Sequence, residues 1–178
     1  WDTEPHANLT FSFLIKPSGL PVSDLFFLNI MASLAIIDVL EELGTPGFRI
    51  KWPNDIYYLD DKLGGILIEN SLRGHEFEYA IIGIGLNANQ THFSSAYRAT
   101  SLKRILGHQT DLNDLLNRLA KRLDWRYGTL LNRDTRILKS EYLERLYRIN
   151  EDGIFSDRHG RFRGMIEGID EQDRKSVV

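Results

Sequence analysis

Hydrophobic and polar residues alternate near the start of the chain, over residues 8–16. This period of two is typical of a strand with one buried face. The positions that share the expected buried face are Leu9, Phe11, Phe13 and Ile15. A long apolar segment then follows, with Ser23 as its expected N-cap and Gly44 as the glycine beyond its end. It predicts a helix over residues 23–43 that is apolar around most of its circumference and lies deep against a sheet.

Short apolar segments separated by turn residues predict a block of strands after this helix. The expected strands cover residues 48–52, 56–59, 63–72 and 76–86. Arg73-Gly74 is typical of the turn of a hairpin that joins the last two. We therefore expect the last three strands to be consecutive antiparallel neighbours in one sheet, with the helix packed on one face. Residues 89–109 show little periodicity and predict a loop.

The last third of the chain changes character twice. Leucines at helical spacing follow a capping Asp111, and a second helical pattern runs from Ile137 to Tyr147. From Asn150 onward, glycine-punctuated β segments such as residues 162–169 replace the helices. We therefore predict two domains, residues 1–149 and 150–178. The fold class is α/β (α+β), with a mixed, largely antiparallel sheet packed with helices, followed by part of a small β-barrel.

Composition narrows the possible functions. The 178 residues carry a net charge of −3, whereas a domain that binds duplex nucleic acid usually has a basic excess. The absence of cysteine excludes disulfides, thiolate metal sites and a cysteine nucleophile, and it fits a cytoplasmic protein. Polar residues such as Asn29, Ser33 and Asp38 interrupt the apolar segment, which favours a buried helix over a membrane span. We expect neither nucleic acid nor membrane as a partner of this chain.

Three short sequences combine turn residues with glycines inside strands: Lys51-Trp52-Pro53-Asn54-Asp55, Lys62-Leu-Gly-Gly-Ile-Leu-Ile-Glu69 and Gly83-Ile-Gly-Leu-Asn87. Glycine weakens a strand and often marks close approach of a ligand, so two such strands paired in a hairpin could form the floor for a flat ligand. Pro53 favours an extended Trp52, which would present Asn54 and Asp55 at a corner. Taken singly, these residues also fit ordinary turns and a solvated lysine.

Taken together, the three sequences resemble the signature of the biotin protein ligase family, with Lys62 seven residues after Asp55. Asn8–Ser12 also resembles the first core strand of that family, and residues 162–170 resemble the start of its terminal β-barrel. The resemblance covers roughly residues 1–147. It implies ATP-dependent ligation of biotin to a lysine of a biotin carboxyl carrier protein through biotinyl-5'-AMP.

The resemblance also implies roles for individual residues. Lys62 matches the lysine between the biotin carboxylate and the α-phosphate of ATP, where two anions must be brought together and a fixed cation is needed. Asp55 matches a carboxylate that binds Mg²⁺ and handles the acceptor lysine. The positions implied to bind biotin or nucleotide are Trp1, Asn54, Gly64, Gly65, Ile66, Gly83, Gly85 and Asn87. A homodimer is a further candidate assembly.

Two departures from the family pattern bear on activity. The glycine- and arginine-rich loop of the family would precede Trp1, and the terminal barrel is cut short at Val178, so we expect this stretch alone to be a poor catalyst. No DNA-binding helical domain is present in it. The alternatives are a lipoate or octanoate ligase or transferase, against which the Trp-Pro-Asn-Asp string argues, and a protein that binds biotin without catalysis. A binder of that kind would need neither Lys62 nor Asp55.

Overall fold

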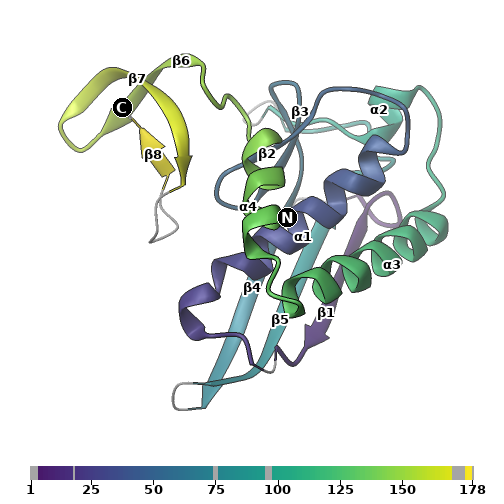
Figure 1. Ribbon diagram of the computed structural model, residues 1–178. Helices are drawn as coiled ribbons and strands as arrows, with labels where there is room; N and C mark the ends of the chain where they lie inside the picture. Colours follow the sequence, from purple (N-terminus) through teal and green to yellow (C-terminus); the bar gives the residue numbers. More distant parts are fainter. Residues whose placement is uncertain (1–3, 18, 74–75, 95–97, 170–174, 178) are drawn as a thin grey trace.

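The computed structural model describes residues 4–17, 19–73, 76–94, 98–169 and 175–177. Its main feature is a five-stranded sheet with the order β1-β5-β4-β3-β2 (Figure 1). The strands are β1 (Leu9–Ile15), β2 (Phe48–Lys51), β3 (Asp55–Tyr58), β4 (Asp61–Arg73) and β5 (Glu76–Leu86). All four neighbouring pairs are antiparallel. The predicted succession of the three motif strands is therefore confirmed.

Helices α1 (Phe26–Glu41), α3 (Leu112–Leu131) and α4 (Thr135–Glu144) cover one face of this sheet (Figure 1). Helix α1 lies in the middle and packs against both other helices and against β2, β3 and β4. The segment Val22–Glu41 is apolar and long enough to cross a membrane, with a mean hydropathy of 1.8, but 56% of its most apolar window is buried inside the protein. This burial makes α1 the core helix that the sequence predicts.

Helix α1 begins three residues later and ends two residues earlier than predicted. A 3-10 turn, η1 (Val22–Asp24), precedes the helix, and Ser23 does not cap it but donates to the carboxylate of Asp24. The cap is dispensable because the turn pairs its own backbone: the N–H of Asp24 donates to the carbonyl of Pro21 and that of Leu25 to Val22. Beyond the other end, Gly44 adopts the predicted left-handed conformation with φ of 75°.

The predicted loop over residues 89–109 contains a short helix, α2 (Leu102–Leu106). The hydroxyl of Ser101 accepts from the N–H of Arg104 at its start, and Gly107 ends it with φ of 80°. Five residues are too few to show a helical period, although the capping residues were visible in the sequence. The predicted cap of α3 is confirmed, since Asp111 accepts from Asn113 and Asp114.

Helix α4 ends at Glu144, earlier than predicted. The following segment runs beside the edge strand β2, where the N–H of Ile50 donates to Arg145 and the N–H of Tyr147 donates to Ile50. Pairing with the strand replaces the helical hydrogen bonds and explains the early end. Tyr147 is thereby placed next to the sheet.

A second sheet follows, formed by β6 (Asp152–Asp157), β7 (Gly160–Ile169) and β8 (Lys175–Val177) in the order β6-β7-β8. It is antiparallel, and the described residues form no closed barrel. The N–H of Asn150 donates to the carbonyl of Ile166 and joins the linker to this sheet. The division into domains at residue 150 stays our interpretation.

Candidate active site

The face of the large sheet that carries no helix holds most of the motif residues. Directly opposite residues of antiparallel strands point to the same face. The register therefore defines one row that crosses all five strands, and its members are Lys51, Asp55, Gly65, Gly85 and Thr10. The next row contains Leu67, Gly83 and Ser12. We call the side of the sheet that carries these two rows the open face.

The alternate residues confirm which face is which. Ile66, Ile82 and Ile84 are buried and belong to the core cluster beneath α1, whereas Leu67 is 61% exposed. Leu14, also on the open face, is 63% exposed. The paired glycines, with Leu67 on one side and the polar Thr10 and Ser12 on the other, form a flat floor on the open face.

An ion pair between two of the motif residues lies beside this floor. The ammonium of Lys62 lies 2.5 Å from a carboxylate oxygen of Asp55, with the side chains 38% and 25% exposed. A bulge explains how Lys62 reaches the open face: Tyr57 pairs with Lys62 and Ile56 with Gly64, which leaves Leu63 as an extra residue. Leu63 is fully buried, so the bulge sends it to the core and its neighbour to the site.

The backbone around Lys62 is held on a second side by a loop. The N–H of Lys62 donates to the carbonyl of Arg98, and the N–H of Thr100 donates to the carbonyl of Lys62, each at 3.0 Å. The same loop receives Asn87, whose side-chain amide donates to the carbonyl of Thr100 at 3.1 Å. Lys62 and Asn87 thus share a neighbour, and Asn87 also donates its N–H to Leu63.

The remaining predicted residues take other positions. The side-chain amide of Asn54 donates to the carbonyl of Ile66 at 2.7 Å and extends the pairing of β3 with β4 beyond a cis Trp52-Pro53 bond. The side chain of Ile66 is buried under the helices, and a β-carbon on Gly64 would point at Leu86. Trp1 lies outside the described residues. The structure therefore brings together Asp55, Lys62, Gly65, Gly83 and Gly85.

Sequence reasoning missed the open-face side chains of Thr10, Ser12 and Lys51. The alternation of β1 was enough to find the first two, because they are the polar positions of that strand. Lys51 could be placed only once the register of β2 against β3 was known. It is the neighbour of Asp55 on the side away from the glycines.

Asp55 fits a magnesium ion that arrives with a nucleotide. Within the described part of the chain, no three His, Asp or Glu side chains gather as a metal cluster. Mg²⁺ keeps several waters and needs only one or two carboxylates when phosphates supply further ligands. A single accessible carboxylate beside the floor is sufficient for that role.

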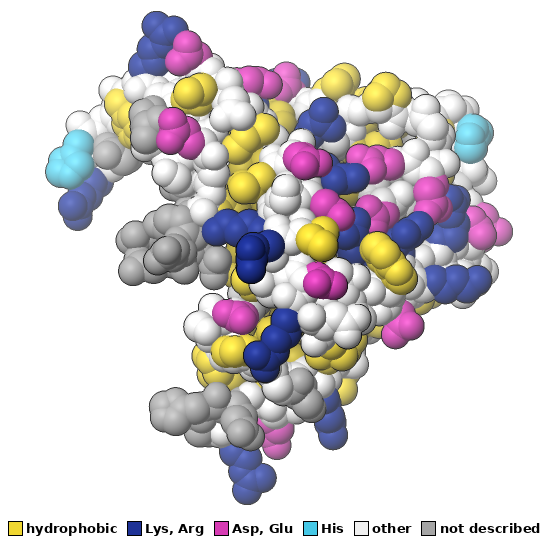
Figure 2. Space-filling model, in the orientation of Figure 1, with side chains coloured by type: hydrophobic (Ala, Val, Ile, Leu, Met, Phe, Trp, Pro, Cys, Tyr) yellow, Lys and Arg dark blue, Asp and Glu magenta, His cyan; other side chains and the backbone are white. Residues whose placement is uncertain are grey.

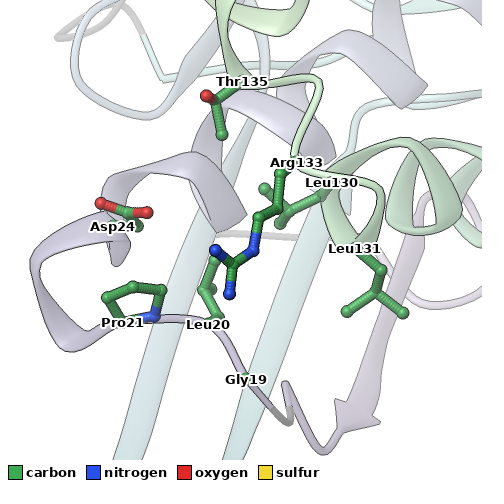
Figure 3. Close-up of a pocket in the computed structure, with 8 residues that line it drawn as sticks. All are labelled: Gly19, Leu20, Pro21, Asp24, Leu130, Leu131, Arg133 and Thr135. Atoms are coloured by element: carbon green, nitrogen blue, oxygen red, sulfur yellow. The ribbon is translucent and has the colours of Figure 1, made fainter.

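A cavity on the helical side is not a candidate for the same chemistry. It lies between the turn before α1 and the α3–α4 connection, where the guanidinium of Arg133 extends over Leu20 and Pro21 (Figure 3). Its volume is about 130 Å³. None of its lining residues belongs to the motif.

Comparison with known proteins shows what this fold and sequence are similar to. Residues 3–87 match the model of the biotin/lipoate A/B protein ligase family. The bifunctional ligase/repressor BirA of Bacillus subtilis is 26% identical over 97% of this chain and 54% of its own length. The biotin–[acetyl-CoA-carboxylase] ligase of Paracoccus denitrificans is 28% identical, over 94% of this chain and 72% of that protein.

Solved structures of biotin protein ligases have a similar fold. The biotin protein ligase of Aquifex aeolicus superposes with a TM-score of 0.81 at 28% identity, over 96% of this chain and 75% of that one. The same ligase in complex with biotin and ATP gives a TM-score of 0.78 at 26% identity, over 97% and 75%. Residues 3–87 are thus similar to the biotin/lipoate A/B protein ligase family, and the chain spans about half the length of the Bacillus relative.

Gly64 faces the core and Gly83 faces the open side, so substitutions at the two positions should differ in their effect on stability. A β-carbon on Gly64 would lie 2.5 Å from the carbonyl oxygen of Gly85, whereas one on Gly83 would have no atom nearer than 3.4 Å. We expect Gly64→Ala to lower the free energy of unfolding by about 1–3 kcal/mol, as overpacking does. Gly83→Ala, which projects onto the open face, should change it by less than about 0.5 kcal/mol. Urea unfolding of both variants checks this, and equal losses would contradict the assignment of faces.

Proposed function

We propose that the protein is a biotin–protein ligase that first joins biotin to AMP and then transfers biotin to a lysine of an acceptor protein. The observation that carries the proposal is the Lys62–Asp55 pair at the edge of the glycine floor. The support from relatives is that the Aquifex aeolicus ligase binds biotin and ATP on the same fold.

In the first step, a carboxylate oxygen of biotin attacks the α-phosphorus of ATP, and pyrophosphate leaves with the electron pair of the broken P–O bond. Both reactants are anions, so their approach needs a fixed positive charge between them. The ammonium of Lys62 stands where the floor ends, with its backbone held by β3 and by the Arg98–Thr100 segment. Asp55 neutralises this ammonium in the absence of substrates and would hold Mg²⁺, which would offset the charge of the phosphates.

In the second step, the amine of the acceptor lysine attacks the acyl carbon of biotinyl-5'-AMP, and AMP leaves. A free lysine has a pKa of ~10.4 and is mostly protonated at neutral pH. Asp55 lies on the floor side of Lys51 and can hold the incoming ammonium and accept its proton. The acceptor in this proposal is a biotin carboxyl carrier protein in the cytoplasm; a homodimer stays a candidate assembly.

The test is a direct assay of the protein expressed at its full encoded length. With ATP, Mg²⁺ and an acceptor domain, we expect pyrophosphate release and a mass increase of the acceptor with biotin, and neither with lipoate or octanoate. Biotin binding without pyrophosphate release would overturn the proposal in favour of a binding protein. Transfer of lipoate or octanoate would reassign the substrate.

Replacing Asp55 by asparagine tests the second step. The amide keeps the shape but accepts no proton, so transfer from preformed biotinyl-5'-AMP should slow by on the order of 10²–10⁴ at neutral pH. The deficit should shrink as pH rises toward ~10, because the acceptor amine then loses its proton to water. A rate profile for wild type and variant between neutral and alkaline pH measures this. A deficit that is the same at every pH would show that Asp55 is not the base.

A further inference from the structure

A second lysine lies in the row that carries the site. Lys51, the last residue of β2, is the direct partner of Asp55 and so points to the open face. The ammonium of Lys51 donates to the hydroxyl of Tyr57 at 2.8 Å and lies 4.4 Å from the centroid of that ring. Among the ion pairs of the described residues, none includes Lys51. A half-buried cation held by neutral groups alone leaves its charge available to an anion.

The support under this ammonium is fixed. The ring of Tyr57 packs on that of Tyr147 at 5.2 Å between centroids, and the N–H of Tyr147 donates to Ile50 at 2.7 Å. The hydroxyl of Tyr147 donates to Asp60, and this bond, together with Arg148, holds the pKa of the Asp60 carboxyl below its ordinary value. The ammonium of Lys51 therefore has a defined position rather than a freely moving one.

The space around Lys51 is concave. A cavity of about 260 Å³ lies between the edge of the large sheet and the second sheet, and it is lined by Lys51, Trp52, Tyr147, Arg148 and residues 153–155. Arg148 is already paired with Asp60 at 3.1 Å, and Glu151 at the rim is exposed. Lys51 is thus the cation of this cavity whose charge no described carboxylate neutralises.

The order of the charged groups along this row indicates which part of a substrate the cavity could bind. From the glycines, the row passes to Asp55 with its partner Lys62 and then to Lys51, with neighbouring strands about 4.8 Å apart. A carboxylate substrate on the floor and an α-phosphate at Lys62 leave the rest of a triphosphate one strand farther on. That position is the mouth of the cavity at Lys51.

We propose that Lys51 binds the β- and γ-phosphates of ATP and stabilises pyrophosphate as it leaves; this inference rests on the proposed function. When the bond between the α-phosphorus and the bridging oxygen breaks, the electron pair stays on the departing diphosphate, which gains negative charge. A lysine ammonium is a suitable point charge for a phosphate group. No proton transfer is required, so Lys51 acts by charge alone.

The test separates the two half-reactions in the full-length protein. Lys51→Met should lower kcat/KM for ATP in pyrophosphate release about 10- to 100-fold, as expected for the loss of one charge-assisted hydrogen bond. Transfer from preformed biotinyl-5'-AMP, which has no β- or γ-phosphate, should keep its wild-type rate. Lys51→Arg should recover part of the loss, and Lys121→Met, at an exposed position of α3, should change nothing.

Calorimetric titration with inorganic pyrophosphate provides a readout that needs no turnover. We expect wild type and Lys121→Met to bind it and Lys51→Met to bind it at least 10-fold more weakly. Equal pyrophosphate affinity in all three, or an unchanged kcat/KM for ATP, overturns the inference. So does a loss confined to transfer, which would place Lys51 at the acceptor. A wild-type protein that forms no adenylate overturns the proposed function instead, and the titration still decides about Lys51.

Discussion

Lys62→Ala is expected to slow biotinyl-5'-AMP formation by on the order of 10²–10³, equivalent to roughly 3–4 kcal/mol of transition-state stabilisation. Lys62 is placed at the floor by a bulge, and its ammonium lies at the carboxylate of Asp55. Without it, the carboxylate of biotin and the α-phosphate meet with no fixed charge between them. Pyrophosphate release by the full-length protein, measured before the acceptor is added, gives this rate directly.

The fold should survive this substitution. The side chain of Lys62 is 38% exposed, and its backbone bonds to Arg98 and Thr100 do not depend on it. A solvated turn lysine would cost within about 0.5 kcal/mol of stability and nothing in rate, which is the result expected for Lys121→Ala. Wild-type pyrophosphate release by Lys62→Ala would mean that the proposed mechanism is wrong.

The sequence was sufficient to predict the strands of the large sheet, because their apolar periodicity is strong and glycines or turns separate them. The pairing of β3, β4 and β5 followed from short connections between consecutive strands. The end of α4 was out of reach, since it depends on hydrogen bonds between residues 145–147 and Ile50, far away in the sequence. Tertiary pairing there overrides a helical pattern that continues to Tyr147.

Only part of the candidate site could be predicted from the sequence, because the rest depends on how the strands pair. The motif identified Asp55 and Lys62, but which neighbouring glycine faces the ligand depends on one extra residue at Leu63. Gly64 and Gly65 look alike in the sequence, yet the first faces the core and the second pairs with Asp55 on the open face. Lys51 gave no signal beyond belonging to the motif, because its role depends on a register.

The helices that support the sheet are joined by a buried charge cluster. The guanidinium of Arg126 on α3 makes two hydrogen bonds of 2.8 Å to Asp38 on α1 and one to Glu141 on α4. Figure 2 shows acidic and basic side chains interleaved over this side of the molecule. The side chain of Arg126 is only 5% exposed. Burial alone would lower the pKa of Arg126, but its bonds to Asp38 and Glu141 outweigh that and hold the pKa above its ordinary value.

Arg126→Met is therefore expected to lower the free energy of unfolding by about 3–5 kcal/mol, because it removes both short hydrogen bonds of the buried Asp38 carboxylate and leaves it only Arg122, at 3.9 Å. Arg122→Met is the matched control, one turn earlier on α3. Arg122 is 34% exposed, pairs mainly with Glu42 at the surface and reaches Asp38 only at 3.9 Å, so its loss should cost less than about 1 kcal/mol. Adding Asp38→Asn to Arg126→Met removes the carboxylate charge and should restore part of the stability.

Urea unfolding of wild type and these three variants measures the differences in the free energy of unfolding. Equal losses for Arg126→Met and Arg122→Met would show that the cluster behaves as an ordinary surface network, and no recovery in the double variant would show that the cost comes from packing rather than from charge.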